Sequence, residues 1–195
     1  MGKPKQVRQQ EIIEALLELA AKNGLAKVST QHIADAVGIA QPTIFRHFKT
    51  REDIICAAVN HVTTGLSGRL SPLFKATTGA DKRLESIITE HLRFLSEQPG
   101  FCRLLLSDQT HLESPSVREK IQTAMESYAL RLSQLIDEGI RSGVFVKKID
   151  STESAKYLVA LFQGLLLRWS LFDFEFSLAD EGGKLWLFYR TTLIN

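Results

Sequence analysis

Four polar side chains recur at helical spacing in the first quarter of the chain: Gln41, Thr43, Arg46 and His47. The apolar residues Ile44 and Phe48 lie four positions apart and would face inward, which leaves these polar groups pointing away from the core. Amide, hydroxyl, guanidinium and imidazole groups on one helix can bind base edges and phosphates in the major groove of DNA. These residues therefore predict contact with a nucleic acid.

Two basic residues, Lys49 and Arg51, follow directly and are placed for contact with backbone phosphates. No acidic residue occurs from Ile39 to Arg51, which suits contact with a polyanion. A polar helix face taken alone is more often simply solvated. A catalytic base at His47 is a further interpretation, but local spacing places no nucleophile or carboxylate near it, so catalysis is not predicted.

Two short helices joined by a glycine turn would position these side chains. Ser29 is a good cap for the first helix, and Gly38 can adopt the positive φ that a tight helix–helix turn requires. The second helix begins near Gln41-Pro42, where proline fits the first turn. The inward-facing residues of the first helix are Ile33, Ala34 and Val37. This pattern is a helix-turn-helix.

The stretch resembles the N-terminal domain of the TetR family of transcriptional regulators. The family pattern is present as Ser29, Ile33-Ala34, Val37-Gly38-Ile39-Ala40, Thr43-Ile44-Phe45, His47-Phe48 and Arg51-Glu52-Asp53-Ile54. Ala40 replaces the usual serine, which removes a helix cap worth about 1 kcal/mol. Pro42 replaces the usual glycine and stiffens the turn, whereas Phe45 replaces the usual tyrosine and lacks its hydroxyl. Arg51 keeps the charge of the usual lysine.

The resemblance implies a double-stranded DNA operator as partner and assigns contacts to particular residues. Phosphate contacts go to Ser29, Thr30, Gln31, His47, Lys49 and Arg51. Base-edge contacts go to Gln41, Pro42, Thr43 and Arg46, and Phe45 would pack on a sugar or a thymine methyl. The resemblance also implies that the C-terminal helices bind a small-molecule effector and that the last two helices pair with a second subunit.

The remaining sequence carries a helical hydrophobic period and no alternating strand series, which indicates an all-α fold. We expect a three-helix DNA-binding domain over residues 1–54, with a connecting helix continuing to about 70, and an effector-binding and dimerisation domain over 71–195. A turn-rich passage is expected from Ser71 to Asp81. An isolated short strand is an open alternative at residues 144–146, and Ser151 or Thr152 is expected to cap the following helix.

Residues 155–172 are apolar on more than one helical face, and a surface helix needs only one such stripe. The extra face meets either the internal core or another chain, and the resemblance favours a homodimer. Two-fold pairing would also place two recognition helices about 34–36 Å apart on one DNA site. The candidate interface residues are Leu161, Leu165, Leu185, Phe188 and Tyr189.

Candidate effector-binding residues combine apolar walls with a few polar tips. They are His91, Phe94, Phe101, Tyr128, Phe162 and Trp169, and each of them could equally be ordinary core. The aromatic-rich passage from Trp169 to Phe176 suggests an apolar or aromatic effector. Arg131 and Arg168 could meet an acidic ligand, or be solvated or paired with acids.

Several other classes of site find no support in the sequence. Cys56 and Cys102 lie far apart and are expected to be reduced and to have packing roles. The other histidines form no metal-binding spacing, and no glycine-rich phosphate loop is present, so neither a metal nor a cofactor is expected. These histidines are His32, His61, His91 and His111.

Location and charge agree with a DNA-binding role. The N-terminus carries no apolar signal segment, and the longest uncharged stretch near the C-terminus, residues 157–167, is shorter than the about 20 residues that span a bilayer. We therefore expect a cytoplasmic protein with no membrane partner. The formal net charge is +2, and residues 1–60 hold all of this excess, with eight Lys and Arg against six Asp and Glu.

Together these features predict a dimeric, ligand-responsive repressor that a small molecule releases from a palindromic operator, with activation left open. The alternative is a helical small-molecule-binding protein or enzyme in which the helix-turn-helix is incidental. That alternative would need a nucleophile, base or metal cluster in residues 80–195, and the sequence offers none, so the protein is not expected to be an enzyme.

Overall fold

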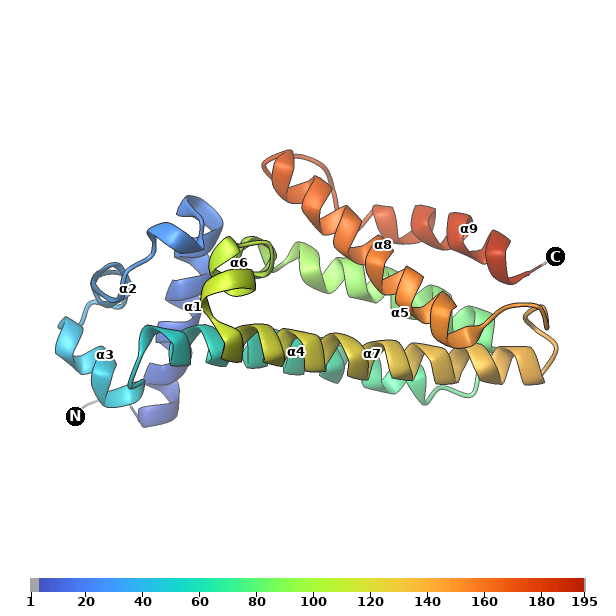
Figure 1. The fold of residues 1–195 in the computed structure, drawn as a ribbon, viewed down its shortest axis with the longest axis horizontal. Coiled ribbons are helices and arrows are strands. Elements are labelled where there is room, and N and C mark those ends of the chain that lie inside the picture. Colours follow the sequence, from blue (N-terminus) through green and yellow to red (C-terminus); the bar gives the residue numbers. More distant parts are fainter. Residues whose placement is uncertain (1–3, 195) are drawn as a thin grey trace. The chain divides into compact units, whose positions relative to one another are not determined.

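The computed structural model describes residues 4–194, and in them it contains helices, turns and loops but no strand. The predicted all-α class is confirmed. Figure 1 traces the helices in chain order. They are α1 (Lys5–Asn23), the 3₁₀ turn η1 (Leu25–Lys27), α2 (Thr30–Val37), α3 (Gln41–His47), α4 (Arg51–Phe74), α5 (Ala80–Ser96), α6 (Pro99–Leu105), the π-helical turn η2 (Gln109–Glu113), α7 (Pro115–Arg141), α8 (Ser151–Leu171) and α9 (Glu181–Leu193).

The chain divides into two compact units. The first comprises the residues up to Thr63 together with Gln98–Gln122, and the second comprises Thr64–Glu97 and the residues from Thr123 onward. The first unit therefore contains residues 98–122, which the sequence analysis assigned to the C-terminal domain. The domain limits 1–54 and 71–195 stay a prediction. Both α4 and α7 run without interruption from one unit into the other.

The core of the first unit forms around α1. Its apolar stripe of Ile12, Leu16 and Ala20 is fully buried, as the helical spacing of these residues requires. The helix α6 packs against α1, and Gly100 makes this possible. A Cβ at Gly100 would lie 1.9 Å from the backbone oxygen of Leu17, so only glycine allows the two backbones to approach so closely.

The local signals of the helix-turn-helix act as predicted. The Ser29 hydroxyl caps α2 by accepting a hydrogen bond from the His32 amide at 3.1 Å. Gly38 ends α2 in the left-handed region, with φ of 72°. The N-cap of α3 is Ala40, and no side chain caps that helix. Ile33, Ala34 and Ile44 lie in the core and fix the two helices against α1, whereas Val37, which was also expected to face inward, is only half-buried.

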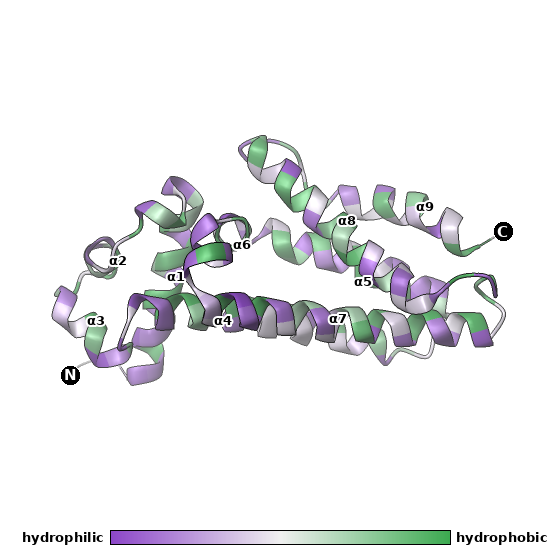
Figure 2. Cartoon of the chain, viewed as in Figure 1, coloured by the Kyte–Doolittle hydropathy of each residue, from purple (hydrophilic) through white to green (hydrophobic). Residues whose placement is uncertain are grey.

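The second unit is built on one buried face of α5, to which Leu84, Ile88 and Leu92 contribute. The helix α9 packs on α5, where a Cβ at Gly182 would lie 2.8 Å from the Cα of Thr89. In Figure 2 apolar and polar residues are interspersed along the helices, as expected where part of each helix surface packs and part meets solvent. The guanidinium of the buried Arg83 donates to Glu138 on α7 and to the carbonyl of Phe74 on α4.

Two local expectations were wrong, and one open alternative is now decided. The helix α4 continues through Pro72 to Phe74, where a turn-rich passage was predicted, because the Phe74 carbonyl accepts from Arg83 and its ring packs edge-on against Tyr128. Residues 144–146 form no strand, since the Phe145 amide donates to Gly139 and the Val146 amide to Leu193. Asp150 caps α8 in place of Ser151 or Thr152.

Within residues 4–194, no helix has the length and apolar character needed to cross a bilayer.

Candidate functional site

The helix α3 presents the surface that the sequence predicts to contact DNA. Ile44 is fully buried and Phe48 nearly so, as expected for the inward-facing anchors. On the outer face, Phe45 is 48% exposed, and Pro42 and Arg46 are exposed as well. Gln41, Thr43 and His47 are half-buried at the edges of this face. The structure thus gathers all the predicted base-edge residues on one short helix, which is firmly held from behind.

A side-chain hydrogen bond joins the two helices of the motif. The amide nitrogen of Gln41 donates to the Thr30 hydroxyl at 2.8 Å, across the turn between α2 and α3. Both residues were predicted to contact DNA, but this bond shows that they also orient each other. A fixed angle between the two helices matters because a groove-reading helix must approach the base edges at one orientation.

Arg51 has an intramolecular role that sequence reasoning missed. Its Nε donates to the carbonyl of Val28 at 2.7 Å, and one terminal nitrogen donates to the carbonyl of Leu25 at 2.7 Å. Burial lowers the pKa of Arg51 from its usual value, an effect that the nearby Glu113 opposes. The forked guanidinium therefore fastens the first turn of α4 to the segment just before the Ser29 cap.

Two further contacts hold the start of α4. Thr50 and Asp53 cap it reciprocally, because the Asp53 carboxylate accepts from the Thr50 amide at 2.9 Å and the Thr50 hydroxyl accepts from the Asp53 amide at 3.1 Å. The hydroxyl of Ser116, in the first turn of α7, donates to the carboxylate of Glu52. The pairing of Thr50 with Asp53 is a capping-box pattern visible in the sequence, whereas no local signal predicts the contact with Ser116.

The other predicted phosphate-contacting residues lie around this motif with varied surroundings. Lys49 is exposed, and Gln31, also exposed, donates to Asp35 at 2.6 Å on the surface of α2. The backbone oxygen of His47 accepts from the Gln9 side chain at 3.2 Å. The Nδ1 of His47 is buried and lacks a hydrogen-bond partner among residues 4–194. Lys3, one of the eight Lys and Arg of residues 1–60, lies outside the described residues.

Three of the predicted effector-binding residues come together in the second unit. The rings of His91 and Phe162 stack with centroids 3.9 Å apart, and the Tyr128 ring lies 5.2 Å from that of His91. The Nδ1 of His91 and the Tyr128 hydroxyl are 3.0 Å apart. Burial lowers the pKa of His91 to about 3, so the imidazole is neutral at physiological pH. Burial also raises the pKa of Tyr128, so two neutral groups share this hydrogen bond.

The other three effector candidates make other contacts. A Cβ at Gly65 of α4 would lie 3.2 Å from the tip of the Phe94 ring, which shows how closely Phe94 packs on α4. Trp169 packs edge-on against Phe174 and donates its ring N–H to the carbonyl of Phe176 at 2.9 Å. Phe101 belongs to the first unit, on α6. Helical periodicity alone could not separate these residues from His91, Tyr128 and Phe162.

Family models match two stretches of the chain, and together these stretches cover most of it. Residues 12–58 match bacterial regulatory proteins of the tetR family, and residues 77–169 match the tetracyclin repressor-like C-terminal domain. The chain belongs to the TetR family. Its class is therefore that of a DNA-binding transcriptional regulator, and the helix-turn-helix of α2 and α3 is the DNA-binding element that this class carries.

Named relatives of this TetR regulator match it over nearly its whole length. The nucleoid occlusion factor SlmA of Vibrio cholerae is 25% identical over 187 residues, which cover 95% of each chain. The SlmA of Marinomonas sp. (strain MWYL1) is 23% identical over 175 residues, which cover 90% of this chain and 89% of that protein.

Solved structures also match the TetR regulator closely. The regulator FadR of Bacillus subtilis, solved with stearoyl-CoA, has a TM-score of 0.82 and 21% identity, covering 94% of this chain and 98% of its own. A regulator from Saccharomonospora viridis, solved with choline, has a TM-score of 0.83 and 22% identity, covering 97% and 99%. At these identities the likeness establishes the fold alone.

The outer faces of α8 and α9 in the TetR regulator carry exposed apolar side chains. Phe188 is 62% exposed, and Leu161 and Leu165 are half-buried. The other two interface candidates, Leu185 and Tyr189, are buried within the protomer, where the Tyr189 hydroxyl donates to the Ser154 carbonyl at 2.6 Å. Large apolar side chains exposed on the same helices, which sequence reasoning did not select, are Tyr157, Leu167, Leu171, Phe172 and Leu187.

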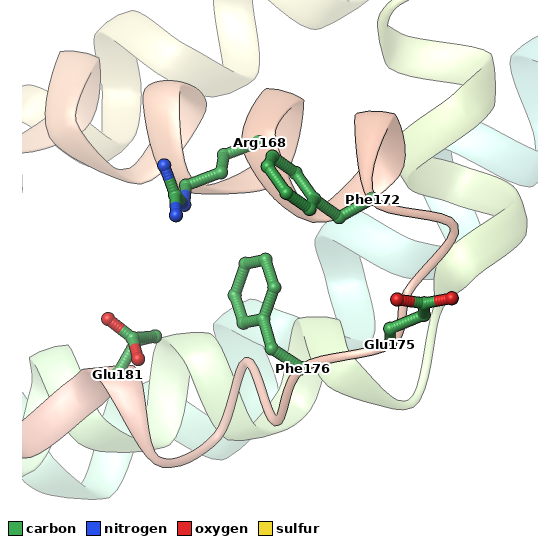
Figure 3. A pocket seen from close by; sticks show the side chains of 5 residues that line it. All are labelled: Arg168, Phe172, Glu175, Phe176 and Glu181. Atoms are coloured by element: carbon green, nitrogen blue, oxygen red, sulfur yellow. The ribbon is translucent and has the colours of Figure 1, made fainter.

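An open pocket lies where α8 ends and the chain turns toward α9 (Figure 3). The guanidinium of Arg168 sits 4.9 Å from the centre of the Phe172 ring, and the Phe176 ring meets Phe172 edge-on. Glu175 and Glu181 complete its lining. Arg131 likewise stacks on a ring, that of Phe74, at 4.1 Å. Both arginines for which the sequence left an acidic ligand open thus contact aromatic rings of their own chain.

Proposed function

We propose that this TetR regulator is a homodimeric repressor, which a small-molecule effector releases from a palindromic operator. The observation that carries the proposal is the rigid presentation of α3, because its polar outer face is backed by the buried Ile44 and Phe48. The face offers Thr43 and Arg46 to base edges and Phe45 to a sugar or a thymine methyl. If the helix-turn-helix were incidental, the protein would not need a polar face backed by buried side chains.

The proposed phosphate contacts surround this helix. Ser29, Thr30 and Gln31 lie at the start of α2, whose N-terminal backbone amides favour an anion, and Lys49 follows α3. Gln41 and Pro42 open α3, so they would reach the groove first. Arg51 is proposed to serve mainly by fixing α4, since its nitrogens already donate to Val28 and Leu25.

The proposed effector site centres on His91, Tyr128 and Phe162, which bring α5, α7 and α8 together. A neutral imidazole and a protonated phenol among aromatic rings suit an apolar or aromatic molecule better than an anion. One similar structure was solved with stearoyl-CoA and another with choline, so these neighbours do not select one ligand class. Release requires the effector to bind the DNA-free conformation more tightly, typically by about 1–3 kcal/mol.

A second candidate function comes from the SlmA relatives, which are nucleoid occlusion factors. The rings of His91 and Phe162 are stacked 3.9 Å apart, so an effector at the proposed site would lie against this pair and not between the two rings. The two candidates differ in a measurable way. Small molecules that raise the melting temperature of the protein are first found in a thermal-shift screen and then added to the protein–DNA complex. A repressor of the proposed kind releases its DNA when one of them binds, whereas a protein that acts without an effector stays bound.

A mobility-shift assay tests the DNA-binding part directly. The probe is the DNA upstream of the protein's own gene, and the variants are Arg46→Ala and Thr43→Ala on α3. We expect each to weaken binding by about 1–3 kcal/mol and to relax sequence preference at one base pair. Arg141→Ala, which removes an exposed arginine at the end of α7, is the matched control. Unchanged affinity and preference in both α3 variants would refute the assignment of α3 as the recognition helix.

A further inference from the structure

The chain passes between its two compact units at three places. The first lies within α4 after Thr63, the second between α5 and α6 after Glu97, and the third within α7 after Gln122. Two of the segments that enter the first unit there contact the helix-turn-helix or α1, the helix on which it packs. The helix α4 holds Val28 through Arg51, and α6 lies against the backbone of Leu17 at Gly100.

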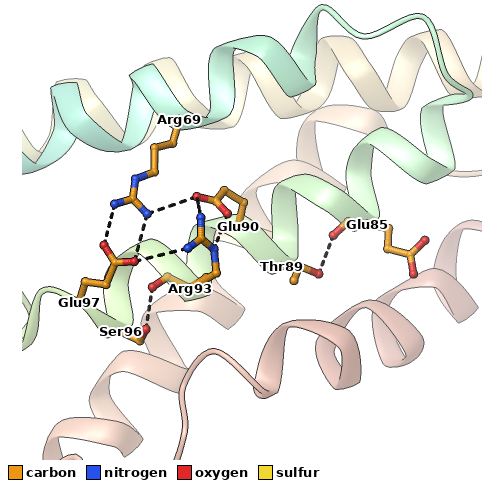
Figure 4. A network of polar contacts seen from close by, with 7 residues as sticks. All are labelled: Arg69, Glu85, Thr89, Glu90, Arg93, Ser96 and Glu97. Carbon is orange, nitrogen blue, oxygen red and sulfur yellow. Dashed lines mark hydrogen bonds and ion pairs between the residues drawn. The ribbon is translucent and has the colours of Figure 1, made fainter.

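Four charged side chains join α4 to the end of α5, close to two of these crossings (Figure 4). Arg69 of α4 donates to both carboxylate oxygens of Glu97, at 3.1 and 2.7 Å. Arg93 donates in the same forked manner to Glu90, at 2.7 Å for each bond. Cross-contacts close the network, since Arg69 lies 3.5 Å from Glu90 and Arg93 lies 3.6 Å from Glu97.

This network differs from an ordinary surface ion pair, which contributes little to stability. Each of its charges faces two opposite charges, and both main pairs are bidentate, the geometry in which guanidinium and carboxylate bind most specifically. Arg69 also lies over the ring of Phe94, 4.9 Å from its centre. The ring is thus covered by two positions of α4, Gly65 and Arg69, which sets the rotation of α4 about its axis.

Hydrogen bonding from Arg69, more than any other influence, holds the pKa of Glu97 below its usual value. The Glu97 carboxylate is therefore charged throughout the physiological range. It is also the last residue of the second unit before the crossing into α6. The bond from Arg69 thus ties a residue of α4 to the point from which α6 begins.

We propose that Arg69, Glu90, Arg93 and Glu97 form a clamp that fixes the register of α4 against the α5–α6 junction. As positioning residues they act on DNA binding only through α4 and the α5–α6 junction. The clamp holds α4 and the start of α6 in one register relative to each other. These are the two helices that contact Val28 and Leu17. Without it they sample several registers, of which only some are competent to bind the operator, and the apparent affinity falls with the competent fraction.

A double-mutant cycle tests the clamp in the full-length protein. The variants are Arg69→Gln, Glu97→Gln and the pair together, and Glu85→Gln is the matched control because it removes an exposed ion pair with Lys82 within α5 alone. The first readout is amide hydrogen exchange of residues 99–105, which none of these substitutions touches directly. We expect about 3- to 10-fold faster exchange there in each single variant, no further change in the double variant, and no change in the control.

The second readout is affinity for the upstream DNA probe, and this part rests on the proposed function. We expect an about 3- to 10-fold loss in each single variant and a similar loss in the double variant. The fourfold inversion R69E/E90R/R93E/E97R keeps each ion pair with its sign reversed but removes the contact of Arg69 with the Phe94 ring, so it should recover part of the affinity lost in the single variants.

The possible failures are distinguishable. If the wild-type protein binds no DNA, the proposed function fails, while the exchange of residues 99–105 still decides whether the clamp exists. Wild-type exchange in Arg69→Gln would overturn the clamp. Additive losses of affinity in the double variant, or no recovery in the fourfold inversion, would also overturn it.

Discussion

His91 of α5 and Phe162 of α8 stack face to face, with ring centroids 3.9 Å apart and planes 8° from parallel. Both side chains are buried, and His91 shares a hydrogen bond with Tyr128 of α7. Three helices that are distant in sequence therefore meet at one titratable group. Its burial makes the stability of the regulator depend on pH in a defined direction.

Stability should fall below about pH 6.5 because of His91. Its pKa is about 3 in the folded protein and about 6.5 when exposed, so between these values the unfolded chain binds one more proton. The free energy of unfolding should then drop by about 1.4 kcal/mol for each pH unit, or about 2 kcal/mol by pH 5. His91→Phe keeps the stack and removes the titration, so urea unfolding should show a correspondingly smaller pH dependence. His61→Gln, which removes an exposed histidine, is the control. If the free energy of unfolding depended on pH equally in the wild type and in His91→Phe, this account would be contradicted.

Removing the Tyr128 hydroxyl should destabilise the second unit. In Tyr128→Phe the buried Nδ1 of His91 loses its hydrogen-bond partner, and an unsatisfied buried polar atom costs about 1–3 kcal/mol. Tyr157→Phe is the matched control, because Tyr157 is 65% exposed and should tolerate the change. Thermal unfolding of both variants at one protein concentration measures the difference. Equal stabilities would show that the hydrogen bond does not matter.

The parts of the structure that sequence could predict are those encoded locally. Gly38 in the left-handed region, the Ser29 cap and the inward-facing Ile44 each depend on residues within about one helical turn, where spacing and residue type decide the outcome. Such patterns were enough to indicate the helix-turn-helix and the all-α class.

Contacts between distant residues were beyond this reasoning. His91 and Tyr128 are 37 positions apart, and Arg51 and Val28 are 23 apart, so periodicity fixes the helix face of each residue but not the neighbour it meets. For the same reason Phe101 could not be separated from the aromatic cluster, although it belongs to the other unit. Pro72 misled because contacts made by Phe74 keep the last turn of α4 helical.

Arg51 and Arg46 should differ in what their removal affects. Arg51→Met breaks charge-assisted hydrogen bonds to the carbonyls of Leu25 and Val28, which should lower the free energy of unfolding by about 1.5–3 kcal/mol. Arg46→Met, on the exposed face of α3, should leave stability unchanged and lower only the affinity for DNA. Chemical denaturation and mobility shift on both variants test this. A fully stable Arg51→Met would mean that its guanidinium is not structurally required.

Gly100 should tolerate no side chain. In Gly100→Ala the new methyl group would lie 1.9 Å from the Leu17 oxygen, so α6 must move away from α1, at a cost of about 3 kcal/mol. Gly68→Ala is the control, since Gly68 lies within α4 with open space around it and should gain about 0.5–1 kcal/mol. Opposite shifts of the unfolding midpoint are expected, and a neutral Gly100→Ala would contradict the close approach of the two helices.

The proposed dimer can be disrupted at Phe188 without disturbing the protomer. This side chain is 62% exposed on α9, so Phe188→Glu should leave the helical content and the protomer core intact. A charge buried at a two-fold interface faces its own copy and destabilises the pair from both sides. Sedimentation should therefore show a monomer, and the affinity for a palindromic probe should fall because the two recognition helices are no longer linked. Leu112→Glu is the matched control, because Leu112 is 75% exposed in η2, away from α8 and α9 in sequence, and should remain dimeric. A Phe188→Glu variant with dimeric mass would place the interface on another surface.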